Sequence, residues 1–569
     1  MVLALPTPAL EARRAAGVVP SWIAYAVSAL VGCVTALLIF PGPVLLGTAE
    51  YWNFPQGVVG SSWGDMAAAL SGYDSFVQEP WQWPLFHVTR LGGAGGVDVI
   101  YTDSTPLLSL MGRVLFQLTG HIVPLYGAWA GACLVGMALA STLLARALGA
   151  HSVLSDGAAA VIGVSMPPLL ARWGHLSLMG QWLIPLALAA YVLLRRRDPA
   201  PGVQIWAVST ALSVLALLIH PYLFLMVTGI MAAVPLQAAV SRRMRPATAA
   251  SVLAGTAGVV AVTMGVMGHF SQEGIAPSGG FGSFSTNVAS AFVPQMSGIL
   301  PLGTPGIMQG TFGQFEGFAY LGLGMLLLLW VSRRTLITRA GLARHKFLLV
   351  FIVGCTALAV SNEVYLAQFH LVSIPLPDAA LRLAGVVRAS GRFIWVPVYL
   401  TAGLAVAAAA RHPQAGIVLL AAALLQWMDV RPWRGLIRES VAHSAPAALD
   451  TEAWVTAIQG VDRVIVDPPW LCTPEKVEYL WVFRASVQIQ LLVSRVGRST
   501  NTAYTARGRA DCWIPPLGTR DLQVQMHVPP VQPMASEHCE ASPDITACSL
   551  TISHTLLRRL TRADTSLGW

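Results

Sequence analysis

The chain has 569 residues, of which 55% are hydrophobic and only 11% are charged, with a formal net charge of +8. This charged fraction is less than half of the roughly 25% that is usual in soluble globular proteins. A soluble protein of this length could not cover its surface with so few charges, whereas a protein that crosses a membrane many times can, because most of its perimeter faces lipid. The arginines stand in short clusters between apolar runs, so orientation in the membrane explains them better than nucleic-acid binding does.

Eleven apolar segments are long enough to be membrane spans. They lie at about residues 21–41, 122–146, 153–171, 179–194, 203–219, 221–241, 248–268, 318–332, 347–361, 393–410 and 415–430. No small-residue cleavage site follows the first segment, so we expect a retained helix rather than a signal peptide. Segment 104–119 is ambiguous, because it is short, begins Ser-Thr-Pro and carries Arg113 near its middle.

The distribution of charge resolves this ambiguity. If segment 104–119 does not cross, the basic clusters all lie on one side, as the positive-inside rule requires, and nearly all loop acids lie on the other. The clusters are Arg13-Arg14, Arg146, Arg195 to Arg197, Arg242 to Arg245, Arg333 to Lys346, and Arg411. We therefore predict a polytopic α-helical protein of the bacterial inner (plasma) membrane with about eleven spans. Its N-terminus is cytoplasmic, its first outer loop covers residues 42–121, and segment 104–119 lies along or dips into the outer surface.

The composition changes after the last apolar segment. We predict a transmembrane domain over residues 1–433 and a small extracytoplasmic (periplasmic) α/β domain over 434–569, in which 461–469 form a strand and turn, and 487–496 an amphipathic helix or strand. The domain contains four cysteines, Cys472, Cys512, Cys539 and Cys548. An even number outside the cytoplasm predicts two disulfides. Of the three pairings, 472–512 with 539–548 is preferred, and the lack of a Cys-x-x-Cys pair disfavours a zinc site.

Polar residues at the ends of the predicted spans gather on the outer side of the membrane. They are Asp65 and Asp103 in the first outer loop, Arg172 and His175 at the next outer turn, His220 at the turn after it, and Arg388 and Arg392 before a late span. Ionisable residues at membrane depth are commonly functional. This set suits transfer of a group from a phosphate-linked lipid: arginines hold the phosphate, a carboxylate takes the proton of the acceptor hydroxyl, and a histidine orients the donor or shares the proton.

Each of these residue types also has a purely structural interpretation. Asp65 can favour the first turn of a surface helix through the helix dipole, and Asp103 can cap a helix that starts near Ser104. The histidines can pack at helix ends, and Arg388 and Arg392 can reach lipid headgroups. The common side of the membrane is the stronger argument for function.

Several short motifs carry a family resemblance. The first outer loop begins its polar stretch with Gly64-Asp65, and Tyr101-Thr102-Asp103-Ser104-Thr105-Pro106 follows it. An Arg-Trp-Gly-His turn ends at His175, and Arg-Ala-Ser-Gly-Arg-Phe begins at Arg388. Together, over residues 20–430, they resemble the polytopic bacterial glycosyltransferases of the GT-C superfamily, especially its YfhO-like and uncharacterised branches.

The resemblance implies a polyprenyl-phosphate sugar donor, an extracytoplasmic active site and an inverting transfer to an envelope glycan, lipid or protein acceptor. In such enzymes an acidic residue of the first outer loop is the base or a metal ligand, and the matching position here is Asp65. The loop lacks the Asp-x-Asp or Asp-Glu pair of the metal-dependent branches, so no motif supports a metal cofactor. Gln490, Asn501, Tyr504 and Arg507 of the C-terminal domain are candidates for choosing the acceptor. The alternatives are a transporter or flippase of a lipid-linked saccharide, and a non-catalytic envelope assembly protein.

Overall fold

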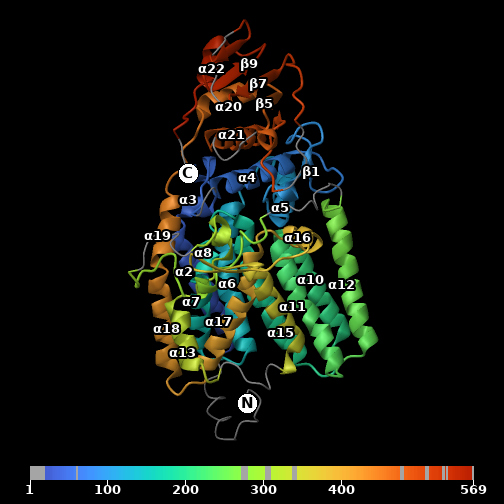
Figure 1. Cartoon of the computed structure of the whole chain (residues 1–569), viewed down its shortest axis with the longest axis vertical. Coiled ribbons are helices and arrows are strands. Elements are labelled where there is room, and N and C mark those ends of the chain that lie inside the picture. Colours follow the sequence, from blue (N-terminus) through green and yellow to red (C-terminus); the bar gives the residue numbers. More distant parts are fainter. Residues whose placement is uncertain are drawn as a thin grey trace.

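The computed structural model describes residues 20–58, 62–270, 280–301, 309–335, 343–473, 480–506, 512–527, 532 and 536–566. The chain forms a bundle of long helices with a small sheet-containing region at one end, and the two are separated by a layer of short helices and loops (Figure 1).

Seven of the described helical segments are long and apolar enough to cross a membrane. They are α2 (Ser21–Ile39), α6 (Tyr126–Ala147), η3 with α9 (Leu176–Arg195), α10 (Gly202–Ile219), α11 (Pro221–Val240), α12 (Pro246–Met267) and η6 with α17 (Ser390–Ala409). Each coincides with a predicted apolar segment, which confirms a helical protein embedded in a membrane.

The other four predicted segments are helical but do not each form a helix of spanning length. Helix α18 (Ala415–Asp429) meets α19 (Arg431–Ser440) at an angle of 41°, and the pair is long enough only when taken together. The remaining three are the short apolar helices α7 (Val153–Val164), α13 (Leu323–Ser332) and α15 (Lys346–Val360), and α8 (Pro167–Leu170) follows α7. By length and composition, the described residues therefore contain seven spans, or eight if the bent pair is one.

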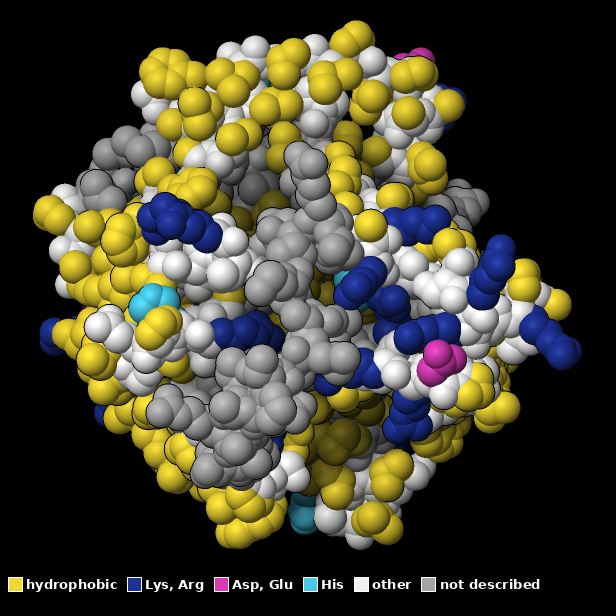
Figure 2. Space-filling view, turned by 90° about the horizontal axis from the view of Figure 1, so that it is seen from below, with side chains coloured by type: hydrophobic (Ala, Val, Ile, Leu, Met, Phe, Trp, Pro, Cys, Tyr) yellow, Lys and Arg dark blue, Asp and Glu magenta, His cyan; other side chains and the backbone are white. Residues whose placement is uncertain are grey.

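The described basic clusters meet at the end of the bundle that faces away from the C-terminal sheet (Figure 1). Arg195 donates to the carbonyl of Arg344, and Arg243 donates to the carbonyl of Arg195, both at 2.7–2.8 Å. Arg411 likewise donates to the carbonyl of Leu148. Seen from this end, the surface carries many Lys and Arg side chains and hardly any acidic ones (Figure 2).

The opposite end of the bundle is covered by the first polar loop. It contains α3 (Gly42–Leu45), η1 (Glu50–Asn53), α4 (Ser62–Gln78), the strand pair β1 (His87–Val88) and β2 (Val97–Asp98), η2 (Val99–Tyr101) and α5 (Pro106–Thr119). Helix α5 corresponds to the ambiguous segment and packs against α4 and α10. Its Arg113 donates to the carbonyl of Phe76 and lies 4.2 Å from the ring centre of Trp81, so the arginine is buried within this loop layer. The hairpin β3 (Glu363–Leu366) and β4 (Phe369–Ser373), then α16 (Asp378–Gly385), connect α15 to η6.

The C-terminal region forms a five-stranded mixed sheet in the order β6-β5-β7-β9-β8. Strand β5 (Arg463–Asp467) pairs in parallel with β6 (Ser499–Thr500) and β7 (Asp521–Met526), whereas β9 (Ile545–Cys548) runs antiparallel to β7 and β8 (Cys539–Ala541). Helices α20 (Thr451–Gly460), α21 (Leu480–Val496) and α22 (His554–Leu560) share its apolar core, and α21 also packs on α4. Helix α19 runs through the predicted boundary at residue 433.

Two disulfides tie this region together, Cys472–Cys512 and Cys539–Cys548. Both preferred pairings are therefore confirmed. Disulfides persist in oxidising compartments, so they agree with an extracytoplasmic location for this end of the chain.

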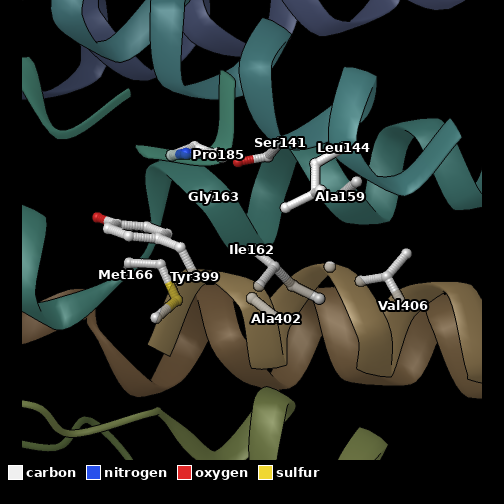
Figure 3. A pocket seen from close by; sticks show the side chains of 11 residues that line it. Ser141, Leu144, Ala159, Ile162, Gly163, Met166, Pro185, Tyr399, Ala402 and Val406 are labelled. Atoms are coloured by element: carbon white, nitrogen blue, oxygen red, sulfur yellow. The ribbon is translucent and has the colours of Figure 1, made fainter. Parts of the chain in front are cut away.

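The interior of the bundle is closely packed. One pocket lies between α6, α7, α9 and α17, where Leu144, Ile162, Tyr399 and Val406 converge (Figure 3). Its volume is about 10 Å³, which is about the space needed for one water molecule. It is therefore a packing gap, not a substrate site.

Candidate functional site

A much larger cavity, of about 480 Å³, lies beneath the loop layer at the end of the bundle that faces the C-terminal region. Its wall is built from distant parts of the chain: α4, the turn after η2, the start of η3, α10, α11, α12, η5 (Phe312–Gly317), the segment before η6, and residues 504–506. Seven residues singled out in the sequence line it, namely Asp65, Asp103, His175, His220, Arg388, Arg392 and Tyr504.

Asp65 stands in the first turn of α4 and is held from two sides. The hydroxyl of Tyr504 donates to its Oδ1 at 2.9 Å, and Nε2 of His175 lies 3.4 Å from its Oδ2. The preceding Gly64 leaves room for Phe483, because a Cβ at position 64 would lie 2.6 Å from that ring. This close approach brings the C-terminal region, and with it Tyr504, against the start of α4.

Asp103 reaches the cavity through a tight turn packed on α4. The turn places Asp103 at φ 58°, a left-handed conformation that Asp adopts more readily than most residues. The Ser104 hydroxyl donates to the carbonyl of Ala69, and a Cβ at Gly72 would lie 2.0 Å from the Thr102 hydroxyl oxygen. Glycine at position 72 therefore allows the turn to sit on α4 and to bring the second carboxylate to the same cavity.

His220 terminates α10 and caps α11. Its Nδ1 accepts the backbone N–H of Tyr222 at 3.1 Å. Because Nδ1 is an acceptor, the neutral ring carries its proton on Nε2. In the cavity wall, His220 is thus a ready-made hydrogen-bond donor as well as a helix cap.

A buried ion-pair cluster forms the floor of this polar region. Glu316 of η5 accepts two hydrogen bonds from Arg392, from Nε at 2.9 Å and from Nη2 at 2.7 Å, and a further short one from Arg172. Glu316, Arg172 and Arg392 are 5%, 2% and 8% exposed. Two glycines make the cluster possible, because a Cβ at Gly391 would lie 2.5 Å from the Cα of Gly317.

Arg388 lies in the cavity wall, and its positive charge is not neutralised by any described carboxylate. Within the described ranges it forms no ion pair, and its guanidinium lies 5.6 Å from the ring centre of Phe284. It is exposed to the cavity, one turn of chain before the buried Arg392. An arginine with free donors in a cavity is suited to an anionic ligand such as a phosphate.

The electrostatics of the carboxylates are unusual. Burial and the neighbouring charge of Asp103 raise the pKa of Asp65 to about 8, although the Tyr504 hydrogen bond opposes the shift. Burial also raises the pKa of Asp103, against the opposing charges of Arg392 and Arg388. Burial lowers the pKa of His175 to about 3, so its ring is neutral at physiological pH. A carboxyl with a pKa near neutrality is what a general base requires.

The cavity wall carries both charged and apolar side chains. Its apolar flank comes from the ends of the candidate spans α10, α11 and α12, through Leu217, Leu225, Met264 and Met267, and from Phe270. The carboxylates, histidines and arginines line the cavity together with further apolar residues, among them Phe284, Phe315 and Val387. The arrangement therefore suits an amphiphilic ligand with a charged head.

The concentration of acids in the first polar loop is only partly explained by this cavity. Of the six carboxylates there, Asp65 and Asp103 line it. Asp74 lies near Arg495, Glu79 accepts the backbone N–H groups of Thr89 and Arg90, Asp98 pairs with His87, and Glu50 is exposed in η1. Those four side chains stabilise the loop layer or face solvent.

Three described candidates, Arg172, Asn501 and Gln490, do not line the cavity. Arg172 lies behind the cavity wall, where it donates hydrogen bonds to Glu316 and to the carbonyl of Phe315. It therefore stabilises the ion-pair cluster and does not contact a ligand in the cavity. Asn501 bonds both backbone groups of Val466, which fixes the chain beside β5. Arg507 lies outside the described residues. Gln490 is buried and accepts the backbone N–H of Tyr504.

Sequence reasoning missed Glu316, the residue that organises both buried arginines. A signal was present, because Glu316 ends the interval from His269 that contains no Lys or Arg and so had no partner nearby in sequence. Tyr504 does line the cavity, and it approaches Asp65 rather than an open acceptor surface. No group of three or more His, Cys, Asp or Glu side chains suited to a metal ion occurs in the described part of the chain.

Comparison with known proteins locates this site within a family. No curated protein matches the chain. The family described as a domain of unknown function, DUF6311, matches residues 29–431. That range includes Asp65, Asp103, His175, Glu316 and Arg388 but not Tyr504. Since it covers well over half of the 569 residues, the chain belongs to the DUF6311 family.

Proposed function

We propose that this protein is a membrane glycosyltransferase that moves a sugar from a polyprenyl-phosphate donor to an acceptor of the cell envelope. The observation that carries the proposal is the cavity itself, where Asp65, with a pKa near neutrality, and the free guanidinium of Arg388 share one space with an apolar flank. A phosphate-linked lipid presents the complementary features, namely an anionic group and a long apolar tail.

The chemistry follows from these groups. The acceptor hydroxyl attacks the anomeric carbon of the donor sugar, and its proton passes to the Asp65 carboxylate. The bond between that carbon and the phosphate oxygen breaks, and the electron pair leaves with the phosphate. Arg388 stabilises the charge that develops there, while neutral His175 and the Nε2–H of His220 orient the reacting groups. Attack opposite to the departing phosphate inverts the anomeric carbon.

The topology that goes with this proposal has about eleven spans in the bacterial inner membrane. The basic end in Figure 2 faces the cytoplasm, and the cavity and the C-terminal region lie outside it. Three of these spans are the short helices α7, α13 and α15. The disulfides and the charge asymmetry support this orientation. Labelling of single introduced cysteines from each side of intact cells measures it directly.

The function is tested with membranes that contain the wild-type protein. They are supplied with radiolabelled polyprenyl-phosphate sugars and native envelope acceptors, with and without a metal chelator. We expect label to appear in an envelope glycan, glycolipid or protein. Label that crosses the membrane without transfer to an acceptor would favour the flippase. A complete lack of both, with every donor tried, would favour an assembly protein.

Removing the free guanidinium is expected to weaken use of the donor. A charge-assisted hydrogen bond contributes about 1.5–3 kcal/mol, so Arg388→Ala lowers kcat/KM for the donor by roughly 10- to 150-fold, and Arg388→Lys restores part of it. The matched control is Arg382→Ala, an exposed arginine of α16 that does not line the cavity. If Arg388→Ala and Arg382→Ala have the same kcat/KM for the donor, Arg388 does not bind the donor phosphate.

A further inference from the structure

A second hollow, distinct from the central cavity, lies on the flank of the bundle where α19 crosses the end of α2. Its volume is about 440 Å³, and Arg431, Arg434 and Arg438 of α19 line it together with Leu38 and Gly298. The three arginines are three and four residues apart, so they project from one face of the helix. α19 lies at the end of the bundle near the C-terminal region (Figure 1).

These arginines carry positive charge that the protein does not neutralise. No described carboxylate lies within ion-pair distance, 4.0 Å, of any of them. Arg438 donates one hydrogen bond, from Nη1 to the carbonyl of Leu38 at 2.7 Å. The guanidinium of Arg434 lies 3.6 Å from the ring centre of Trp427, and its Nη1 is buried without a hydrogen-bond partner among the described residues.

The surroundings of the hollow are apolar and exposed. On α2, Leu37 and Leu38 are 61% and 51% exposed, and on α18, Leu424 and Met428 are 57% and 46% exposed. Helix α2 is a candidate span, and α18 is a candidate span only together with α19, which lines the hollow. Apolar side chains with this exposure on spanning helices face lipid chains. Arginines therefore line the hollow, and the two helices beside it, α2 and α18, expose apolar side chains to lipid.

The position of the arginines is an exception to the charge distribution of the chain. The basic clusters that connect the spans lie at the opposite end of the bundle, whose surface is rich in Lys and Arg (Figure 2), and Arg388 and Arg392 at this end line the central cavity. Membrane orientation explains that end but not three arginines at this one. An anionic ligand at the level of the headgroups explains them, because basic pockets at the ends of spanning helices bind lipid phosphates.

We propose that this hollow binds the phosphate of an anionic phospholipid, with its acyl chains along α2 and α18. The site is separate from the central cavity and does not depend on the proposed transfer reaction. Arg431, Arg434 and Arg438, which all line the hollow, supply charge-assisted hydrogen bonds to the phosphate. A zwitterionic lipid of the same chain length provides the phosphate but adds a cation that the arginines repel.

The test uses the full-length protein, purified in detergent and stripped of lipid, and titrated with phosphatidylglycerol, phosphatidylcholine or inorganic phosphate. Native mass spectrometry measures the dissociation constant of the tightest bound lipid, and the thermal unfolding midpoint gives an independent reading. We expect phosphatidylglycerol to bind and to raise the midpoint more than phosphatidylcholine does. A triple change of Arg431, Arg434 and Arg438 to Gln is expected to weaken the tightest binding on the order of a hundredfold.

The matched comparison is Arg438→Gln against Arg382→Gln, two exposed arginines at the same end of the bundle. Arg438→Gln is expected to weaken phosphatidylglycerol by about fivefold, and Arg382→Gln not at all. This pair also carries the test if the triple variant fails to fold. Equal binding by both single variants, or an equal shift with inorganic phosphate alone, would overturn the proposal.

Discussion

Asp65→Asn is expected to lower the rate of sugar transfer by about 10²- to 10⁴-fold, the usual contribution of a general base. The amide has the shape of the carboxyl and its oxygen can still accept the hydrogen bond that Tyr504 donates to Oδ1. The protein is therefore expected to insert and fold normally, so the loss is one of proton transfer. The measurement is transfer of label from a polyprenyl-phosphate sugar in membranes with matched amounts of each variant.

The dependence of the rate on pH gives a second reading of the same residue. A base acts when it is deprotonated, and the pKa of Asp65 is raised to about 8 by burial and by Asp103. The rate of the wild type is therefore expected to rise with pH through about 8, not through the usual 4. Since Asp103 contributes to the shift, Asp103→Asn is expected to move this rise to lower pH. Neutral His175, with a pKa of about 3, adds no step in this range.

The control for these variants is Asp378→Asn, an exposed aspartate in the first turn of α16 that does not line the cavity. It is expected to transfer sugar at the wild-type rate. If Asp65→Asn transfers sugar at the same rate as this control, the protein is still an enzyme but Asp65 is not its general base. Asp103 is then the next candidate. An unchanged pH profile in Asp103→Asn would show that the two carboxyls do not act on each other.

Glu316→Gln is expected to lower the free energy of unfolding the most, by about 3–5 kcal/mol. The change leaves the buried positive charges of Arg172 and Arg392 without a counter-charge. Burial by itself raises the pKa of Glu316, but the two guanidiniums outweigh it and hold that pKa well below the ordinary value. The carboxylate is therefore ionised and serves both arginines. The midpoint of thermal unfolding in detergent measures the loss.

Glu363→Gln is the matched control, because Glu363 pairs with His370 on the surface of the β3–β4 hairpin. Its expected cost is within about 1 kcal/mol. A double-mutant cycle separates the ion pairs from packing: adding Arg172→Gln to Glu316→Gln removes one of the stranded charges, so the combined loss is expected to be smaller than the sum of the single losses. Additive losses would contradict a coupled cluster.

The periodic and compositional features of the sequence predicted much of the fold. Long apolar runs predicted α2, α10, α11 and α12 to within a few residues, because a membrane span is a local property of about 20 residues. Helix α15 was also predicted to within one residue at each end, whereas α7 and α13 are shorter than their predicted segments, since hydropathy does not say where a helix ends. Two disulfides followed from the even number of cysteines expected outside the cytoplasm, and both have the preferred pairing.

The site was predicted unevenly for the same physical reason. The convergence of Asp65, His175, His220 and Arg388 followed from assigning span ends to one side of the membrane. The roles of Arg172 and Asn501 did not, because each depends on a partner over 30 residues away, Glu316 and Val466. The distances between packed segments decide which arginine is buried in a salt bridge and which remains free. The number and position of the spans do not give these distances.

The sequence by itself determined that this is a helical membrane protein with its acids and bases sorted to opposite ends, because hydropathy and charge act locally along the chain. Tertiary structure alone decided which groups share a cavity. Close contacts at Gly64, Gly72 and the Gly317–Gly391 pair bring α4, the Asp103 turn, η5 and the C-terminal region together. The resulting burial shifts the pKa of Asp65, pairs Arg392 with Glu316 and leaves Arg388 free. Such effects depend on distances between segments hundreds of residues apart, and no local pattern encodes them.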